Sequence, residues 1–210
     1  MRLYRTLVHA GVLAVACMAL AGCVSLLPKA KPADMYRFGA APAVQTDASA
    51  PVQPGSINIA QGPVNFDTPA SNDRILTMTG PNAAYVANAR WISPAPALFG
   101  EALLRAFETT PGAPRLLAHA APQLAPTSLS VDVQAFEARY DQGADAPPSI
   151  VVVLHATLYS QKDRSIVAER TFSVAQRAGD NRVSAIVGAF NTAVQQILAG
   201  LITWSGQAAA

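Results

Sequence analysis

The sequence predicts an α+β fold: an antiparallel sheet with two amphipathic helices packed on one face. Segments in which apolar and polar residues alternate are typical of strands with one solvent-exposed face. The clearest such segment is 128–136. Two other segments, 94–107 and 183–202, carry apolar residues three and four positions apart, as amphipathic helices do. One-sided strands and one-sided helices bury their apolar surfaces best against each other, which gives this architecture.

The expected strands follow one another along the chain. A short segment of alternating apolar and polar residues, 35–38, is expected to form an edge strand. Strand patterns then occur at 57–59, 74–79, 85–91, 115–118, 128–136, 150–159 and 166–174. The polar turn 161–164 should join the last two as a hairpin. Within 128–136, alternation places Leu129, Val131, Val133 and Ala135 on one face of the strand.

The two helices have recognisable ends. Ser93 is suited to cap the first, with Pro94 and Pro96 in its opening turn. This helix should stop at Thr110, because a proline and a glycine follow it. The last helix is expected to end near 204–206.

The N-terminus carries an export signal. A basic start precedes an apolar run, 10–20, that is too short to span a bilayer. The run ends in the order Leu20, Ala21, Gly22, Cys23, which is the pattern of a bacterial lipobox. Small residues before the cysteine give the signal peptidase access, and the thiol takes the lipid. We therefore expect cleavage between Gly22 and Cys23, and no cofactor other than a covalent diacylglycerol and an N-acyl lipid on Cys23.

Two alternatives exist at this signal. The first is a plain secretory signal followed by a coincidental cysteine. The second is lipidation at Cys17, but Ala14 stands where the lipobox has leucine, and Cys17 lies inside the apolar run.

These signals divide the chain into four parts. They are a signal peptide, 1–22; a Pro/Ala-rich tether beginning with lipidated Cys23, 23–55, with an edge strand at 35–38; a single periplasmic domain, 56–205; and a tail, 206–210. The tether residues 24–33 reach at most about 33 to 36 Å when fully extended, enough to lift a domain off the lipid headgroups.

Charge and cysteine content exclude some classes of protein. Arg2 and Arg5 are two of the 15 basic residues, so processing leaves 13 against 13 acidic ones. A neutral chain without a basic cluster is not typical of a nucleic-acid-binding protein. Only Cys23 remains in the mature chain, so no disulfide is available and the fold must rest on its hydrophobic core.

The sequence lacks the motifs of common catalytic sites, such as a Walker loop, GxSxG or HExxH, and no His or Cys set has metal-ligand spacing. A Ser–His–Asp set could be assembled from Ser128 or Ser130, Asp132 and His155, but no glycine-rich elbow exposes either serine. We interpret His155 as a residue on the less buried face of a strand, and we expect no catalytic or metal-binding residues.

Arg90 and Trp91 have two interpretations. They could form a docking pair, or Trp91 could be a core residue beside a solvated Arg90. The second is favoured because large aromatic side chains are mostly buried.

Several short motifs occur in a characteristic order along most of the mature chain. They are residues 36–38, RILTMT from Arg74, YVANARW from Tyr85, AFE from Ala106, LSVDVQAFEA from Leu129, VAERTF from Val167, AF at Ala189 and the terminal Trp204. This order, together with the lipobox, resembles the ABC-type transport auxiliary lipoprotein family, which includes lipoproteins that accompany MCE-domain proteins in envelope lipid transport. The resemblance implies a non-enzymatic periplasmic subunit whose partners are an MCE-domain protein and its ABC permease/ATPase complex.

Val24 and Ser25 follow Cys23 in place of the aspartate that retains many enterobacterial lipoproteins in the inner membrane. By this resemblance the anchor lies in the outer membrane of a Gram-negative bacterium, on the periplasmic face.

Two functional hypotheses follow. The first is an adaptor that links the transport complex to the outer membrane, and the alternative is a lipoprotein that itself binds or carries a lipid in an apolar groove. The spacing of apolar residues does not distinguish a solid core from a groove. Free strand edges at 35–38 and 57–59 would also allow a homo-oligomer.

Overall fold

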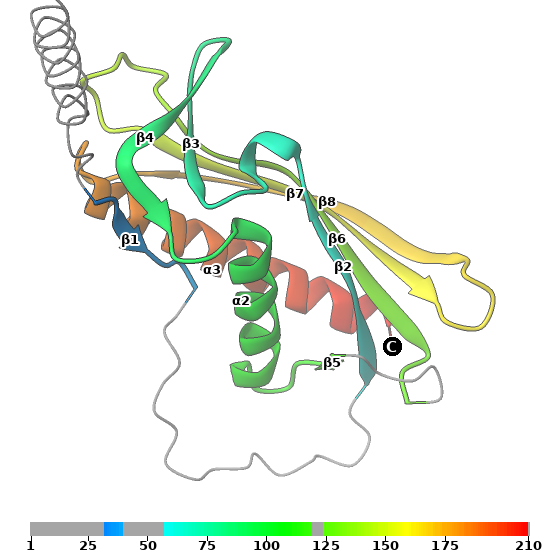
Figure 1. Cartoon of the computed structure of the whole chain (residues 1–210). Helices are drawn as coiled ribbons and strands as arrows, with labels where there is room; N and C mark the ends of the chain where they lie inside the picture. Colours follow the sequence, from blue (N-terminus) through cyan, green and yellow to red (C-terminus); the bar gives the residue numbers. More distant parts are fainter. Residues whose placement is uncertain (1–31, 40–56, 119–123, 210) are drawn as a thin grey trace, which may run out of the picture. The chain divides into compact units, whose positions relative to one another are not determined.

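The computed structural model describes residues 32–39, 57–118 and 124–209, which form an eight-stranded sheet with two helices (Figure 1). The strands are β1 (Asp34–Tyr36), β2 (Asn58–Phe66), β3 (Arg74–Thr79), β4 (Asn82–Trp91), β5 (Arg115–Leu117), β6 (Thr127–Arg139), β7 (Ser149–Ser160) and β8 (Ile166–Arg177). The helices are α2 (Ala95–Thr109) and α3 (Val183–Ala208), and a short 3₁₀ turn, Thr68–Ala70, precedes β3. The predicted α+β class is confirmed.

The sheet is mixed, however, and not antiparallel throughout. β6, β7 and β8 pair antiparallel, as do β3 and β4. The pairs β1–β4, β2–β5, β2–β6 and β3–β6 are parallel. The chain passes through α2 between β2 and β6, and a crossover of this length lets a strand return in the direction of its partner. β2 consequently lies between β5 and β6, so the expectation of a free edge at 57–59 was wrong.

A bulge in β6 changes which residues face the core. The register between β6 and β7 shifts between Val133 and Ala135. Leu129, Val131 and Val133 are buried as expected, but beyond the bulge Phe136 is buried and Ala135 is only half-buried. The expected burial of Ala135 with the other three was therefore wrong, because an inserted residue reverses the alternation.

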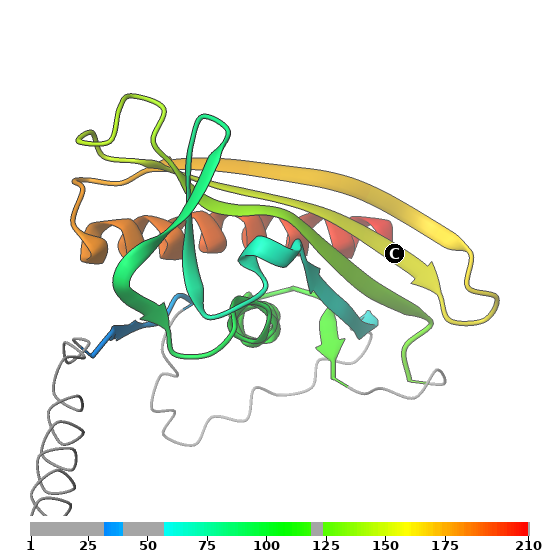
Figure 2. The same cartoon turned by 45° about the horizontal axis from the view of Figure 1, so that its top comes forward.

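Aromatic rings fill the space between the sheet and the helices. Trp91 of β4, Phe136 of β6, Phe190 of α3 and Phe38 are each at most 2% exposed. Their ring centroids lie 5.0 Å apart for Phe38–Trp91 and 4.9 Å for Phe136–Phe190, in the edge or tilted arrangements that aromatic rings prefer. Figure 2 shows α3 extending along the sheet and α2 nearly end-on beneath it.

The folded domain exceeds the boundaries expected from the sequence. β1 pairs with β4 and the buried Phe38 follows it, so the domain includes residues before position 56. At the other end α3 continues to Ala208, so most of the expected tail belongs to the helix. Ser93 is not the cap of α2, because Pro94 occupies the cap position and makes no side-chain bond there. The expected signal peptide, 1–22, and most of the tether lie outside the described residues.

α3 is the central helix of the core. With 26 residues and a mean hydropathy of 1.5 over its most apolar window, it alone among the described helices is long and apolar enough to cross a membrane. Half of that window is buried inside the fold. Its apolar side packs against β7 and β8, which agrees with the spacing seen in the sequence.

Candidate functional site

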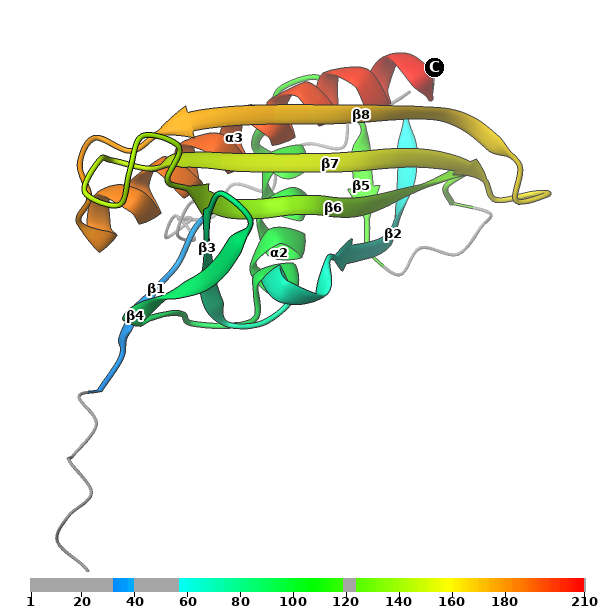
Figure 3. The ribbon, with the colours of Figure 1, turned by 90° about the horizontal axis from the view of Figure 1, so that it is seen from above.

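Figure 3 views the sheet from the side away from α3. Strand register brings together the polar residues of β6 and β7 that the sequence analysis considered for catalysis. Asp132 of β6 is the cross-strand partner of His155 of β7, and His155 is the partner of Thr171 of β8. Asp132 accepts a hydrogen bond of 2.7 Å from the side-chain amide of Asn65. The two ring nitrogens of His155 lie 3.1 Å from the Thr171 hydroxyl and 3.5 Å from the Glu169 carboxylate.

The contacts described for these residues do not join either serine to His155. Ser130 and Ser128 face Thr157 and Tyr159 across the strand pair, whereas the contacts described for His155 are to β8. A serine nucleophile needs its base within hydrogen-bond reach. Over the described ranges, no group of three His, Cys, Asp or Glu side chains is placed to hold a metal ion.

Arg90 and Trp91 take the structural roles that were favoured. Trp91 is 1% exposed and lies among the core aromatic rings. Arg90 is exposed and its guanidinium binds both oxygens of Asp73, at 2.9 and 3.0 Å.

The longest open edge of the described sheet belongs to β8. This strand pairs with β7 from Ile166 to Arg177 and with no other described strand. An unpaired edge presents a row of backbone N–H and C=O groups that can bind an extended segment of another chain. At its start, Ile166 and Val167 are 57% and 47% exposed, so the edge also offers apolar contacts.

The turn between β7 and β8 is held by side-chain hydrogen bonds. The carboxylate of Asp163 accepts hydrogen bonds from the backbone N–H and the hydroxyl of Ser165, at 3.2 and 2.8 Å. Hydrogen bonds from Ser160 and Ser165 hold the pKa of Asp163 below its ordinary value. Lys162 and Arg164 flank this carboxylate, so the tip of the hairpin carries charges of both signs.

The hairpin and β1 lie far apart along the sheet. Thr127 of β6 pairs with Ser160 at the hairpin, whereas Phe38, just after β1, contacts Phe136 of β6. Phe136 is nine residues further along β6, which corresponds to about 30 Å of strand. The chain thus enters the domain near the Phe136 end of β6. The hairpin lies near the Thr127 end of β6, and the edge of β8 is open.

Cys23, the expected lipid-attachment residue, and its neighbour Gly22 lie outside the described residues, so their processing stays a prediction. The sequence analysis did not identify the open edge of β8. Its one signal was the predicted hairpin, whose second strand, 166–174, was given no partner other than the first. Periodicity identifies a strand but does not show which strands will have a partner on each side.

The family model for the ABC-type transport auxiliary lipoprotein component matches residues 36–201. Among solved structures, a DUF330 protein from Xanthomonas campestris is 23% identical, with a TM-score of 0.65 over 83% of this chain and 96% of that one. An uncharacterised protein is 15% identical, with a TM-score of 0.62 over 83% of this chain and 99% of that one. Identities this low show the fold alone. No curated protein matches the sequence.

Proposed function

Since this chain belongs to the ABC-type transport auxiliary lipoprotein component family, we propose that it is a non-enzymatic, lipid-anchored subunit that links an ABC/MCE-type envelope lipid transport complex to the outer membrane. The single observation that carries this proposal is the family match across the folded domain. The proposed partners are the periplasmic part of an MCE-domain protein and, through it, the ABC permease and ATPase.

The anchor of this adaptor is the lipid on Cys23. A diacylglycerol and an N-acyl chain together hold a protein firmly on a membrane, where a single chain binds reversibly. The residues after the anchor, Val24 and Ser25, support the outer membrane as its location by resemblance to other lipoproteins.

The proposed docking surface is the β8 edge with the adjoining hairpin. Its supports are the open row of backbone groups, the exposed Ile166 and Val167, and the distance from the point where the tether enters. An adaptor must present its partner surface away from its membrane attachment, and this edge meets that requirement.

The alternative, a lipid carrier, requires an apolar space that a lipid chain could occupy. The rings of Trp91, Phe136 and Phe190 contact one another between the sheet and α3, with centroids 4.9 to 6.3 Å apart. This packing supports the adaptor, because the centre of the layer is occupied by side chains.

The chain without its signal peptide and lipid is expected to bind the periplasmic part of its cognate MCE-domain protein and to carry no stoichiometric phospholipid. Native mass spectrometry of the chain, alone and mixed with the partner, measures both. Replacing Ile166 and Val167 by lysine should weaken the complex, whereas the control Gln195→Ala, on the exposed side of α3, should not. One phospholipid per chain together with no complex at micromolar concentration would overturn the adaptor and favour the lipid carrier.

Cys23→Ala is expected to leave an unprocessed precursor, or a protein without stable outer-membrane attachment, because no thiol remains to take the lipid. Incorporation of labelled palmitate, followed by membrane fractionation, measures this. Cys17→Ala is the matched control and should keep full labelling. Undiminished labelling of Cys23→Ala would exclude the lipobox at this position.

A further inference from the structure

We propose that the exposed side of β1 and of the end of β4 is a membrane-contact surface, which rests on phospholipid headgroups and orients the domain beside its own anchor. We call this surface the β1–β4 face, and it consists of Met35 and Arg90 in the two strands together with Arg37 and Ile92, the residues that directly follow them. The proposal rests on the lipidation of Cys23 proposed above.

Strand pairing places the four side chains together. Met35 and Arg90 are partners in the parallel β1–β4 pair. One step further along, the backbone N–H of Ile92 donates to the carbonyl of Tyr36 at 2.8 Å, which keeps Arg37 and Ile92 adjacent. The result is a patch in which apolar and guanidinium side chains alternate between the two strands.

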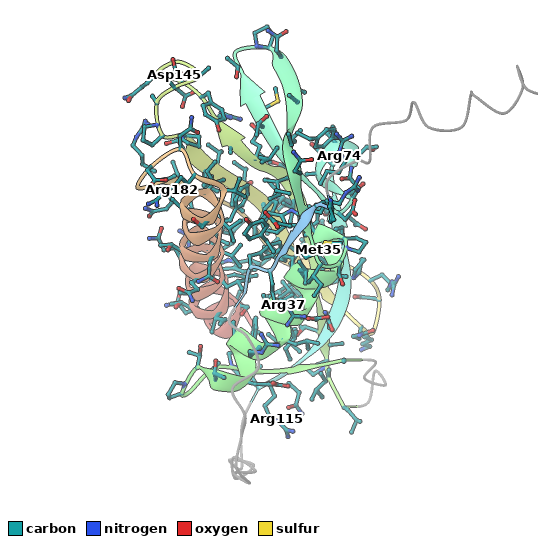
Figure 4. All side chains as sticks on the ribbon, turned by 60° about the vertical axis from the view of Figure 1, so that its left-hand side comes forward. Met35, Arg37, Arg74, Arg115, Asp145 and Arg182 are labelled. Atoms are coloured by element: carbon teal, nitrogen blue, oxygen red, sulfur yellow. The ribbon has the colours of Figure 1, made fainter. Side chains whose placement is uncertain are left out.

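Both apolar members of the patch are unusually exposed. Met35 is 61% exposed and Ile92 is 57% exposed, and they are two of the five exposed large hydrophobic residues in the described ranges. In Figure 4, Met35 and Arg37 lie on the same side of the domain as Arg74, which pairs with Arg90 across β3 and β4. Two apolar side chains beside the two arginines suit the boundary between lipid headgroups and acyl chains, where the apolar groups would enter and the guanidiniums would bind phosphate.

The arginines retain donors for phosphate even though they form ion pairs. One terminal nitrogen of Arg37 donates to Glu101 at 3.1 Å, and one terminal nitrogen of Arg90 contacts Asp73. A guanidinium has five N–H donors, so each of these pairs leaves further donors for a lipid phosphate. Because Asp73 and Glu101 balance the two arginines, the contact should depend mainly on the apolar side chains and only weakly on salt.

The position of the tether identifies the membrane as the occupant of this face. Only residues 24–33 separate Cys23 from β1, and they span at most about 33 to 36 Å. The β1–β4 face therefore begins where the tether ends, whereas the exposed Ile166 and Val167 lie at the distant hairpin. A short tether holds a surface near its target at an effective concentration on the order of millimolar, so a weak lipid contact suffices once the anchor is inserted.

Tryptophan reporters test this contact in the full mature lipoprotein. The lipidated protein carrying Met35→Trp is reconstituted into vesicles of phosphatidylethanolamine and phosphatidylglycerol, with or without bromine on the acyl chains near the headgroups. The fluorescence added by the new tryptophan is expected to shift to shorter wavelength and to be lost in brominated vesicles. Ile92→Trp is the second reporter and should respond alike, while the native Trp91 and Trp204 are buried and give a common background.

Ile166→Trp is the matched control, because Ile166 is as exposed as Ile92 but lies at the hairpin. Its emission is expected to be the same in both kinds of vesicle. Intact-mass measurement before reconstitution establishes whether Cys23 carries lipid. A chain without lipid overturns both the anchor and this proposal. A lipidated chain whose Met35→Trp and Ile92→Trp emission is not quenched, or is quenched no more than that of Ile166→Trp, overturns the β1–β4 contact alone.

Discussion

Phe190→Ala is expected to lower the free energy of unfolding by about 3 to 5 kcal/mol, because it removes a fully buried ring and leaves a cavity in the core. Phe190 extends from α3 to the rings of Trp91 and Phe136, with centroids 5.3 and 4.9 Å away. These rings join the helix to β4 and β6. An ordinary domain is stable by about 5 to 15 kcal/mol, so the loss is a large part of the total.

Urea denaturation of the chain without signal peptide and lipid measures this loss, provided that the dependence on urea concentration is the same for both proteins. Gln195→Ala, on the exposed side of the same helix, should change stability by no more than about 0.5 kcal/mol. A loss below about 1 kcal/mol for Phe190→Ala would contradict the packing of α3 on the sheet.

Gly62→Ala is expected to cost about 1 to 3 kcal/mol by overpacking. A Cβ atom at position 62 would lie 2.6 Å from the backbone carbonyl oxygen of Leu129 in β6. The β2–β6 register shifts between Gln61 and Val64, so the two backbones approach closely where the glycine stands. Leu129 is also paired with Leu158 of β7, so its carbonyl has little freedom to move.

The control for this substitution is Gly188→Ala, measured by the same denaturation. Gly188 lies inside α3, and a Cβ there would meet no atom within 4 Å apart from the neighbouring backbone of its own helix. Alanine at that position should raise stability by about 0.5 to 1 kcal/mol, since glycine weakens a helix interior. The same chemical change is thus expected to have opposite signs at the two positions. If Gly62→Ala also proved stabilising, the close approach of β2 and β6 would be wrong.

Local patterns in the sequence predicted the elements whose apolar spacing is uninterrupted. α3, β3 and the β7–β8 hairpin were expected close to their observed positions. β2 was expected only at 57–59, because Gly62 and Pro63 interrupt its alternation, although the strand continues to Phe66. The burial of Phe136 also could not be predicted, since the bulge that turns it inward has no counterpart in the alternation of the sequence.

Strand order and the candidate surfaces depend on contacts between distant parts of the chain. Parallel pairing of β2 with β6 follows from the crossover through α2, which no short window of sequence contains. The lipid site proposed at Cys23 could be suggested by the sequence alone, because a lipobox is a contiguous motif. It did not indicate the β1–β4 face, because Met35 and Ile92 become neighbours only through strand pairing.

The pairing of β1 with β4 has a mechanical consequence for the adaptor proposed above, in which this part of the chain would connect the domain to the membrane. Tension on the proposed anchor would enter the domain at Asp34, and would have to separate β1 from β4 and then break the ion pair between Arg37 and Glu101. Further extension must withdraw Phe38 from its contacts with Trp91 and Phe136. Such a force would act directly on the aromatic core, so the time for which the domain stays folded under tension would depend on the rate at which that core opens.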